Sequence, residues 1–490
     1  MKLSRIMLAV ASLAAASVAM AAPNDSRIGY STGASATKGN LRLALIALCP
    51  AGNTLTEFTS GGNVSTYVCA TSALSAGATG TYATSGNAVF TNFTGTQFAE
   101  LRLNVGAGSF SFIRGFNNVF TDDFGSNLVF REPALGASGA DQSKAQLLAA
   151  RPTVVYVGGL SDVQASAFPT GVTAGFTLPN TPSVGVQQAF GVAVSVPLYN
   201  EMFKSQRATS GGATQLKPIP SAATYPSCTT DGSGNPTNTT DPVCMPTISK
   251  GEMASIMSAS DTNAAYIKGA NFLASTLPAG TELRYVRRVN TSGTQAAAQN
   301  YFLGLPCSAV SNTVVDEPTA QDETDTVVVP GFIPATFDLF DSLIGSIRVL
   351  AAGGTTNVRQ ELSKSTIQSG ATNYAIGVMS GENNQTVGNL FRWLRVQGAS
   401  MTENAAPGLG QTNRVSVVNG SYDFYYESVY AAGPANGVGV NSGASVSGAA
   451  ANFWIPVSNA LKTLNATGLV KAADQLYTKG GQSCAANTSN

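Results

Sequence analysis

The chain has 490 residues, no histidine, and 27 Lys and Arg against 27 Asp and Glu. The absence of histidine excludes Ser-His-Asp and Cys-His catalysis, HExxH zinc sites and histidine-ligated haem. Charged residues make up 11% of the sequence, against a usual value of about 25%, and they form no basic run. The composition therefore argues against a nucleic-acid partner.

The N-terminus has the pattern of a bacterial signal peptide. Lys2 and Arg5 are followed by an apolar run over 6–18 and by Ala-Met-Ala at 19–21, a typical signal-peptidase site. No later run reaches the roughly 18 apolar residues that a transmembrane helix needs. We therefore predict a signal peptide over 1–21 and a mature chain without a membrane span. Its location would be the periplasm, or the outside or surface of a Gram-negative cell.

Helix-like and strand-like patterns alternate along the chain. Apolar residues recur at helical spacing over 41–49, and further helices are expected over 250–257 and 294–303. Short apolar runs predict buried strands over 153–157, 191–196, 283–287 and 374–379. This alternation predicts an α/β fold with largely parallel sheets. About 470 mature residues are too many for one core, so we expect two or more lobes.

Three segments differ in composition from the rest and predict loop insertions. Residues 207–247 are rich in Pro, Ser, Thr and Gly, 311–326 are acidic, and 432–450 are rich in Gly, Ala and Ser.

Six cysteines in an exported chain predict disulfide bonds. No C-x-x-C pattern occurs, so the spacing does not match a structural zinc site. Six cysteines allow 15 pairings, and the sequence does not fix which of them forms. The natural pairs, two local and one by elimination, are Cys49–Cys69, Cys228–Cys244 and Cys307–Cys484.

The clearest chemical motif is Arg-Arg-Val-Asn-Thr-Ser-Gly-Thr at 287–294, between a strand-like and a helix-like run. Such a loop brings hydroxyls and unpaired backbone N–H groups together at a helix N-terminus. Gly293 lets the backbone approach a ligand closely, and Arg288 can give two hydrogen bonds to a tetrahedral oxyanion. The alternative is that Ser292 or Thr294 simply caps the helix. Spacing alone leaves both interpretations open.

Three more turns rich in glycine and hydroxyls stand at strand-to-helix transitions, at 31–38, 106–111 and 158–162. The last follows a predicted strand at its carboxyl end, where open α/β sheets place ligands. A plain turn explains any one of them better than a binding site does. Four such features at the same kind of transition favour a common site.

The motifs and their order resemble the phosphate-binding proteins of ABC importers, members of the type II periplasmic binding protein superfamily. The matching segments, scattered over 28–430, are 33–37, 108–111, 159–162, 190–200, 248–257, 288–294, 375–378 and 422–427. The Ser-Gly-Thr loop at 292–294 is the most specific of them.

The resemblance implies a two-lobed type II periplasmic-binding-protein fold. Each lobe would be a mostly parallel sheet flanked by helices, and two crossing strands would join the lobes. Lobe 1 would comprise 22–195 and 375–490, and lobe 2 would comprise 196–374 with the insertions at 207–247 and 311–326.

The resemblance also implies a solute-binding protein that closes around a small oxyanion, phosphate first. The residues expected to contact the oxyanion are Thr37, Ser109 (or Ser111, because the register is open), Arg288, Ser292, Gly293 and Thr294. Asp162 would accept the proton of hydrogen phosphate. Sulfate has no proton at neutral pH, so it would leave that carboxylate facing an unprotonated oxygen. Such a protein is no enzyme, needs no cofactor or metal, and would be a monomer that serves an ABC permease.

The chain departs from the family pattern at two places. Asn290 stands where the family has an aspartate that pairs with the arginine, which would leave Arg288 less oriented and the site more positive. The tryptophan usual after the second-lobe helix is missing from 258–266. These departures, the long insertions and the low charge support a second hypothesis. It is a structural or adhesive envelope protein that keeps the fold without a transport ligand.

Overall fold

The computed structural model describes residues 28–52, 54–60, 64–70, 100–106, 108–117, 119, 129–132, 140–143, 155–207, 219–258, 269–307, 316–318, 340–344, 346–367, 369–383, 390–402, 414–433, 449–463, 469–471, 477–479 and 487–489. The predicted signal peptide at 1–21 and most of 311–326 and 432–450 lie outside these ranges. Among the described helices, none is long and apolar enough to cross a membrane.

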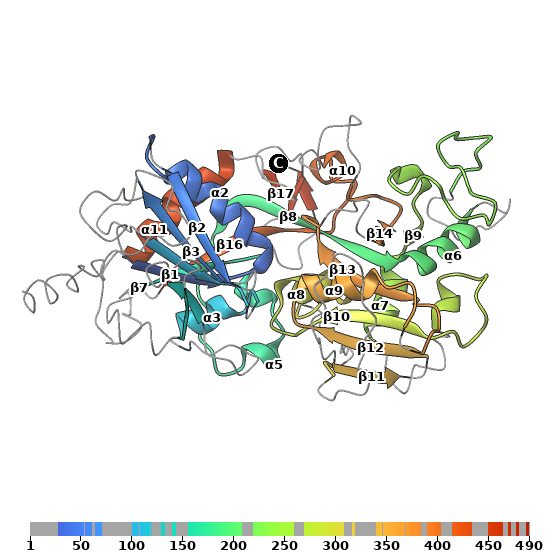
Figure 1. Ribbon diagram of the computed structural model, residues 1–490, viewed down its shortest axis with the longest axis horizontal. Helices are drawn as coiled ribbons and strands as arrows, with labels where there is room; N and C mark the ends of the chain where they lie inside the picture. The colour runs from blue at the N-terminus through green and yellow to red at the C-terminus, as the bar shows by residue number, and fades with distance from the viewer. Residues whose placement is uncertain are drawn as a thin grey trace, which may run out of the picture.

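The described strands form mainly one 13-stranded sheet with helices packed on it (Figure 1). Its first half contains β1 (Ile28–Gly33), β2 (Thr54–Ser60), β3 (Val64–Ala70), β4 (Glu100–Asn104), β7 (Val155–Ser161), β16 (Tyr425–Ala432) and β17 (Leu469–Lys471). Its second half contains β10 (Leu283–Arg288), β11 (Phe340–Ile344), β12 (Ile347–Ala352), β13 (Ala375–Ser380) and β14 (Phe391–Trp393). The long strand β8 (Ser183–Ser195) pairs with both halves.

The sheet is mixed rather than largely parallel, which corrects the expectation from the sequence. Parallel pairs occur in β4-β1-β7 and in β12-β10-β13. The strands around them pair antiparallel: β2 with β3, β3 with β4, β11 with β12, and β8 and β16 with their neighbours. The lobe boundaries and the two crossing strands implied by the resemblance stay predictions.

Helices pack on both halves of the sheet. On the first half lie α2 (Lys38–Leu48), α3 (Ser111–Phe116) and α11 (Ala449–Thr463). The second half carries α6 (Val196–Gln206), α7 (Lys250–Met257), α9 (Thr355–Leu362) and α8 (Gly293–Ala298), which continues into a π-helical turn η8 (Gln299–Leu303). Short helical turns are η2 (Ser35–Thr37), η5 (Ala165–Ala167), α5 (Thr170–Thr173), η6 (Pro242–Cys244), η7 (Gly269–Phe272) and α10 (Val415–Val418). The small sheets are β5 (Val129–Glu132) with β6 (Ala140–Ser143), β9 (Thr247–Ile248) with β15 (Arg395–Val396), and β18 (Tyr477–Lys479) with β19 (Asn487–Ser489).

Local sequence explains where the predicted elements begin. The helix predicted over 250–257 is α7, which starts at a capping box: the Glu252 backbone N–H donates to Ser249 Oγ at 3.1 Å, and the Ser249 N–H donates to the Glu252 carboxylate at 2.7 Å. The predictions over 41–49 and 294–303 correspond to α2 and to α8 with η8. The four predicted strands lie within or overlap β7, β8, β10 and β13.

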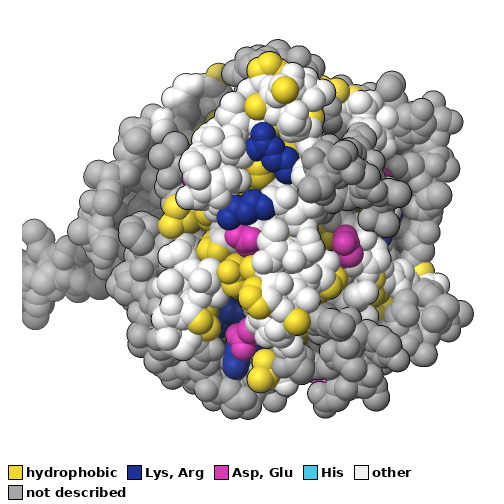
Figure 2. Space-filling view, turned by 90° about the vertical axis from the view of Figure 1, so that its right-hand side faces the viewer, with side chains coloured by type: hydrophobic (Ala, Val, Ile, Leu, Met, Phe, Trp, Pro, Cys, Tyr) yellow, Lys and Arg dark blue, Asp and Glu magenta, His cyan; other side chains and the backbone are white. Residues whose placement is uncertain are grey.

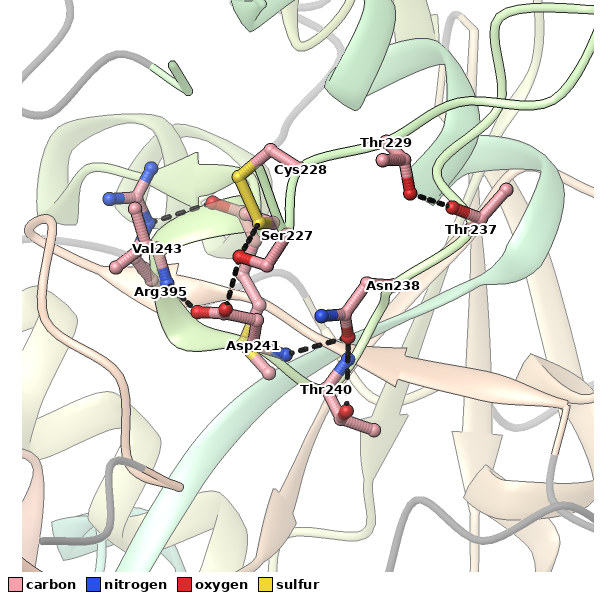
Figure 3. The surroundings of a disulfide bond; sticks show 11 residues. Ser227, Cys228, Thr229, Thr237, Asn238, Thr240, Asp241, Val243 and Arg395 are labelled. Atoms are coloured by element: carbon pink, nitrogen blue, oxygen red, sulfur yellow. Dashed lines mark hydrogen bonds between the residues drawn. A yellow bond between two sulfur atoms is a disulfide. The ribbon is translucent and has the colours of Figure 1, made fainter. Parts of the chain in front are cut away.

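Two of the three predicted disulfides are present, Cys49–Cys69 and Cys228–Cys244. Figure 3 shows the second, where Ser227 donates to Asp241 at 2.6 Å and Asp241 caps the turn by accepting from the Val243 N–H at 3.0 Å. These contacts order part of the predicted insertion over 207–247. Cys484 lies outside the described residues, so its pairing with Cys307 stays a prediction.

The low charge of the sequence is visible on the surface. Figure 2 shows a face whose described part is mostly uncharged, with a few Lys and Arg side chains lying close to Asp and Glu side chains. On that part of the surface there is no broad basic patch of the kind that binds nucleic acid.

Candidate functional site

The carboxyl ends of the parallel strands in the two halves point toward one another. β13 is antiparallel to β8, β8 is antiparallel to β16, and β16 is antiparallel to β7. β7 and β13 therefore run in opposite directions, and their carboxyl ends approach each other across β8 and β16. The loops after β1, β4 and β7 consequently face the loops after β10, β12 and β13.

Direct contacts join the loop before α3 to the loop before α8. The Phe110 N–H donates to the carbonyl of Thr291 at 3.0 Å. A Cβ atom on Gly293 would overlap Ser109 Oγ and would lie 2.9 Å from Ser109 Cβ and 3.1 Å from Asp162 Oδ2. Three residues predicted from separate motifs, Ser109, Asp162 and Gly293, are thus in contact, and only glycine fits at position 293 without displacing its neighbours.

Asp162 is a buried carboxyl with an incomplete set of hydrogen bonds. It is 2% exposed, and Ser109 Oγ donates to its Oδ2 at 3.4 Å. Its other oxygen, Oδ1, is buried and has no hydrogen-bond partner among the described residues. Burial raises the pKa of Asp162 to about 7, and the negative charge of Glu382 adds to that effect, while Arg288 and the Ser109 hydrogen bond oppose it. A buried acceptor without a partner is unfavourable, and the described residues supply none for Oδ1.

Arg288 is held in a fixed orientation by the loop after β12. Its Nε donates to the Ala352 carbonyl at 3.2 Å, and its terminal nitrogens donate to Thr355 Oγ1 at 2.9 Å and to the Gly353 carbonyl at 3.0 Å. A guanidinium has five N–H donors, so these three bonds leave two without a partner in the described part of the chain. Burial lowers the pKa of Arg288 to about 10 and the carboxylates of Asp162 and Glu382 raise it, so the side chain stays charged at neutral pH.

The hydroxyls at the start of α8 are buried without capping the helix. Ser292 occupies the N-cap position, yet its side chain makes no capping hydrogen bond. Both Ser292 and Thr294 are buried, and within the described ranges neither hydroxyl has a hydrogen-bond partner. The interpretation that Ser292 merely caps this helix is therefore wrong, and both hydroxyls remain able to donate to a ligand.

Two other predicted hydroxyls are already used by the backbone. Thr37 Oγ1 donates to the Ala34 carbonyl at 2.8 Å, and Ser111 Oγ donates to the Gly108 carbonyl at 2.7 Å. A hydroxyl has one proton, so neither side chain has one left for an anion in this conformation. Ser109 Oγ likewise donates to Asp162, so the roles of Thr37, Ser109 and Ser111 toward a ligand stay predictions, and Ser109 differs in that its partner is the Asp162 carboxyl itself.

The expectation that Asn290 leaves Arg288 poorly oriented is wrong. The side-chain oxygen of Asn290 accepts a hydrogen bond from Arg287, and its backbone N–H donates to the Glu317 carboxylate at 2.7 Å. Arg288 is oriented by backbone carbonyls instead, so it is not left loose by the absence of an aspartate at 290. Glu317, from the acidic insertion, holds the loop that leads to Ser292.

Sequence reasoning also missed Glu382, which follows β13 at its carboxyl end. Ser380 Oγ donates to its Oε1 at 2.6 Å, and Gln188 Nε2 donates to its Oε2 at 3.3 Å. The signal was available, because an acidic residue directly after a predicted buried strand fits the rule that drew attention to Asp162.

Within the described ranges, no group of three or more acidic or cysteine side chains could hold a metal ion.

No protein-family model matches the chain, and no curated protein matches it. Among solved structures, the chain is similar to a phosphate ABC transporter substrate-binding protein from Clostridium perfringens with bound phosphate. The two share 9% sequence identity with a TM-score of 0.34, over 88% of this chain and 92% of that chain. Similarity at this level decides nothing about the ligand of this chain.

Proposed function

We propose that this protein is a solute-binding protein for a small tetrahedral oxyanion that carries a proton, with hydrogen phosphate as the first candidate. The observation that carries the proposal is the contact of Gly293 with Ser109 and Asp162. It joins the loops of both halves of the sheet at a buried carboxyl whose Oδ1 has no described partner.

The hydrogen-bonding groups match such a ligand. Arg288 offers two N–H donors, and Ser292 and Thr294 offer hydroxyl donors. Asp162 offers an acceptor, which a protonated oxyanion needs and a fully deprotonated one cannot use. With sulfate, this acceptor would stay unpaired at a cost of about 1–3 kcal/mol, which corresponds to roughly 10- to 100-fold weaker binding.

In this proposal the chain works outside the cytoplasm, which its disulfide bonds favour. Ligand contacts from both halves of the sheet would stabilise the conformation in which their loops meet. A membrane permease would then recognise that conformation. The protein would act as a monomer and would catalyse no reaction.

Calorimetric titration tests the proposal. The protein is freed of ligand by unfolding and refolding with its disulfides intact. Phosphate and sulfate are compared at about pH 8.5, above the pKa of about 7 of Asp162, so that its carboxyl is ionised. We expect micromolar or tighter phosphate binding and little sulfate binding. Asp162→Asn, which replaces an acceptor by an amide with N–H donors, should bind sulfate better than the wild type does. Arg288→Ala should lose both anions while keeping the fold.

Retained affinity in Arg288→Ala would contradict the assignment of this site. If the folded wild-type protein binds neither anion, the proposed function is wrong and a structural role in the cell envelope is favoured.

A further inference from the structure

The helix that begins at the oxyanion loop has few large side chains of its own. α8 includes three consecutive buried alanines at 296–298, whose methyl groups bury little area. Gln295 Oε1 accepts from the Arg288 N–H at 3.1 Å and ties the start of the helix to β10. The first large aromatic side chains, Tyr301 and Phe302, follow in the π-helical turn η8. The contacts of η8 therefore help to set the direction of the helix.

Tyr301 is the centre of a compact cluster with Lys250, Asp423 and Phe424, which we call the clasp. The Tyr301 hydroxyl donates to Asp423 Oδ1, and Lys250 Nζ donates to Asp423 Oδ2 at 3.1 Å. The Lys250 ammonium also lies 3.8 Å from the centre of the Tyr301 ring, a cation–π contact. The same ring stacks on Phe424, with 4.4 Å between the ring centres and 14° between the planes. Tyr301 thus contacts every other member of the clasp.

The clasp joins the two halves of the sheet. Lys250 lies on α7 and Tyr301 on η8, in the second half, whereas Asp423 and Phe424 lead into β16 of the first half. The segment before β16 is itself fixed to β8, because the Phe190 N–H donates to the Phe424 carbonyl at 3.0 Å. The far end of the α8–η8 helix is therefore held against the other half of the sheet.

A second tyrosine holds the neighbouring residue of η8. The Tyr426 hydroxyl, from β16, donates to Asn300 Oδ1. Burial and the Asp423 carboxylate raise the pKa of Tyr301, so its hydroxyl keeps its proton and donates at neutral pH. Burial raises the pKa of Tyr426 in the same way. Two consecutive residues of η8 are thus tied to the first half by tyrosine hydrogen bonds.

We propose that the clasp positions the oxyanion site by holding the far end of the helix that begins at Ser292 and Thr294. The inference rests on the proposed function and adds to it residues that act on the ligand without touching it. At about 1.5 Å per residue, Tyr301 lies about 12 Å along the helix from Gly293. A change of direction at this end therefore moves the start of the helix against Ser109, which Gly293 contacts from the other half.

Tyr301→Phe tests the inference, because it keeps the ring contacts and removes only the hydroxyl that reaches Asp423. Phosphate affinity in the titration described above should fall roughly three- to tenfold. Amide hydrogen exchange at 296–298 in the ligand-free protein should become severalfold faster. Tyr199→Phe on α6 removes a buried hydroxyl without a hydrogen-bond partner among the described residues. It is the matched control, and both measurements should stay unchanged.

The ammonium of Lys250 gives a second test, with rescue by a conservative substitution. Lys250 and Asp423 are partly exposed, so substitutions there should fold. Lys250→Met should weaken phosphate binding, and Lys250→Arg, which keeps the positive charge, should restore most of the affinity.

The Thr294→Ala background separates positioning from a merely structural role. One donor that the clasp would position is already absent there, so Tyr301→Phe should weaken phosphate binding by a clearly smaller factor than in the wild type. An equal factor in both backgrounds, or no loss in either, would overturn the inference and leave the oxyanion site intact. If Tyr301→Phe does not fold, Asp423→Asn, which keeps an acceptor oxygen but not the charge, is held to the same criteria.

Failure of the inference and failure of the proposed function give different results. Normal phosphate binding by the wild type, with unchanged hydrogen exchange in Tyr301→Phe, would overturn the inference alone. A wild type that binds neither anion would refute the proposed function and this inference with it.

Discussion

The contact between Gly293 and Ser109 gives the sharpest test of the site, through the substitution Gly293→Ala. The added methyl would overlap Ser109 Oγ and would lie 2.9 Å from Ser109 Cβ. Rotation of the hydroxyl can move Oγ away, but Cβ is fixed to the backbone, so the loop before α3 must shift. The third neighbour, Asp162 Oδ2 at 3.1 Å, would move with it.

The magnitude comes from two opposing effects. Alanine is favoured over glycine in a helix by about 0.5–1 kcal/mol, and overpacking a tight contact costs about 1–3 kcal/mol. We expect the clash to dominate, so that Gly293→Ala is less stable than the wild type by up to about 2 kcal/mol. Because the displaced groups are Ser109 and Asp162, phosphate affinity should fall by about tenfold or more.

Denaturant unfolding and calorimetry measure both effects, and the chain offers matched controls. Gly39 in α2 has no atom within 4 Å of a built Cβ, and Gly251 in α7 has only Ser249 Oγ at 3.9 Å. Alanine at these two positions should stabilise the protein. Combining Gly293→Ala with Ser109→Gly removes the two closest contacts and should recover most of the lost stability. If Gly293→Ala is as stable and binds as tightly as Gly251→Ala, the close approach of the two loops is wrong.

Three further predictions concern pH, the disulfide and the acidic insertion. The folded-state pKa of Asp162, about 7 against an ordinary 3.8, means that the folded protein binds more protons in that window. Its stabilising contribution, about 4 kcal/mol, is therefore complete below about pH 4 and is lost as the pH rises through about 7. Unfolding of ligand-free Asp162→Asn should lack this slope; equal slopes would contradict the assignment. Replacing Cys228 and Cys244 by serine should cost about 3 kcal/mol of unfolding free energy in denaturant titrations, given their separation of 16 residues, and an unchanged midpoint would refute that. Glu317→Gln turns the charge-assisted hydrogen bond to the Asn290 N–H into a neutral one. Phosphate affinity measured by calorimetry should therefore fall severalfold, with little change in melting temperature. Unchanged affinity would show that Glu317 is not needed to position the loop before α8.

Elements with a local cause could be predicted from the sequence. The capping box of Ser249 and Glu252 lies within four residues, and α7 spans the predicted range. The apolar spacing that gives α2 its buried face is equally local, since Leu41, Leu45 and Leu48 are all buried. The loops that supply Ser109, Asp162 and Gly293 could be singled out because glycine and hydroxyl residues mark strand-to-helix turns.

Features that depend on pairing between distant strands could not be predicted. The position of Glu382 opposite Asp162 follows from the antiparallel order of β13, β8, β16 and β7, which no local pattern encodes. The orientation of Arg288 by the carbonyls of Ala352 and Gly353 was equally hidden. Every residue has a carbonyl, so the sequence cannot indicate which one an arginine will use. Because these carbonyls could not be foreseen, the absence of an aspartate at position 290 was expected to leave Arg288 without an orienting partner.

Asp162 is a buried carboxyl that can change its charge near neutral pH in a chain that has no histidine. Histidine is the side chain that ordinarily changes charge near neutral pH, and this chain has none. A carboxyl titrates there when its surroundings oppose its ionisation, and for Asp162 burial is the largest cause, with the charge of Glu382 second. In the proposed site, affinity for an anion would come from the buried donors of Ser292, Thr294 and Arg288. Selection among anions would then depend on whether the ligand carries a proton for the Asp162 carboxylate to accept.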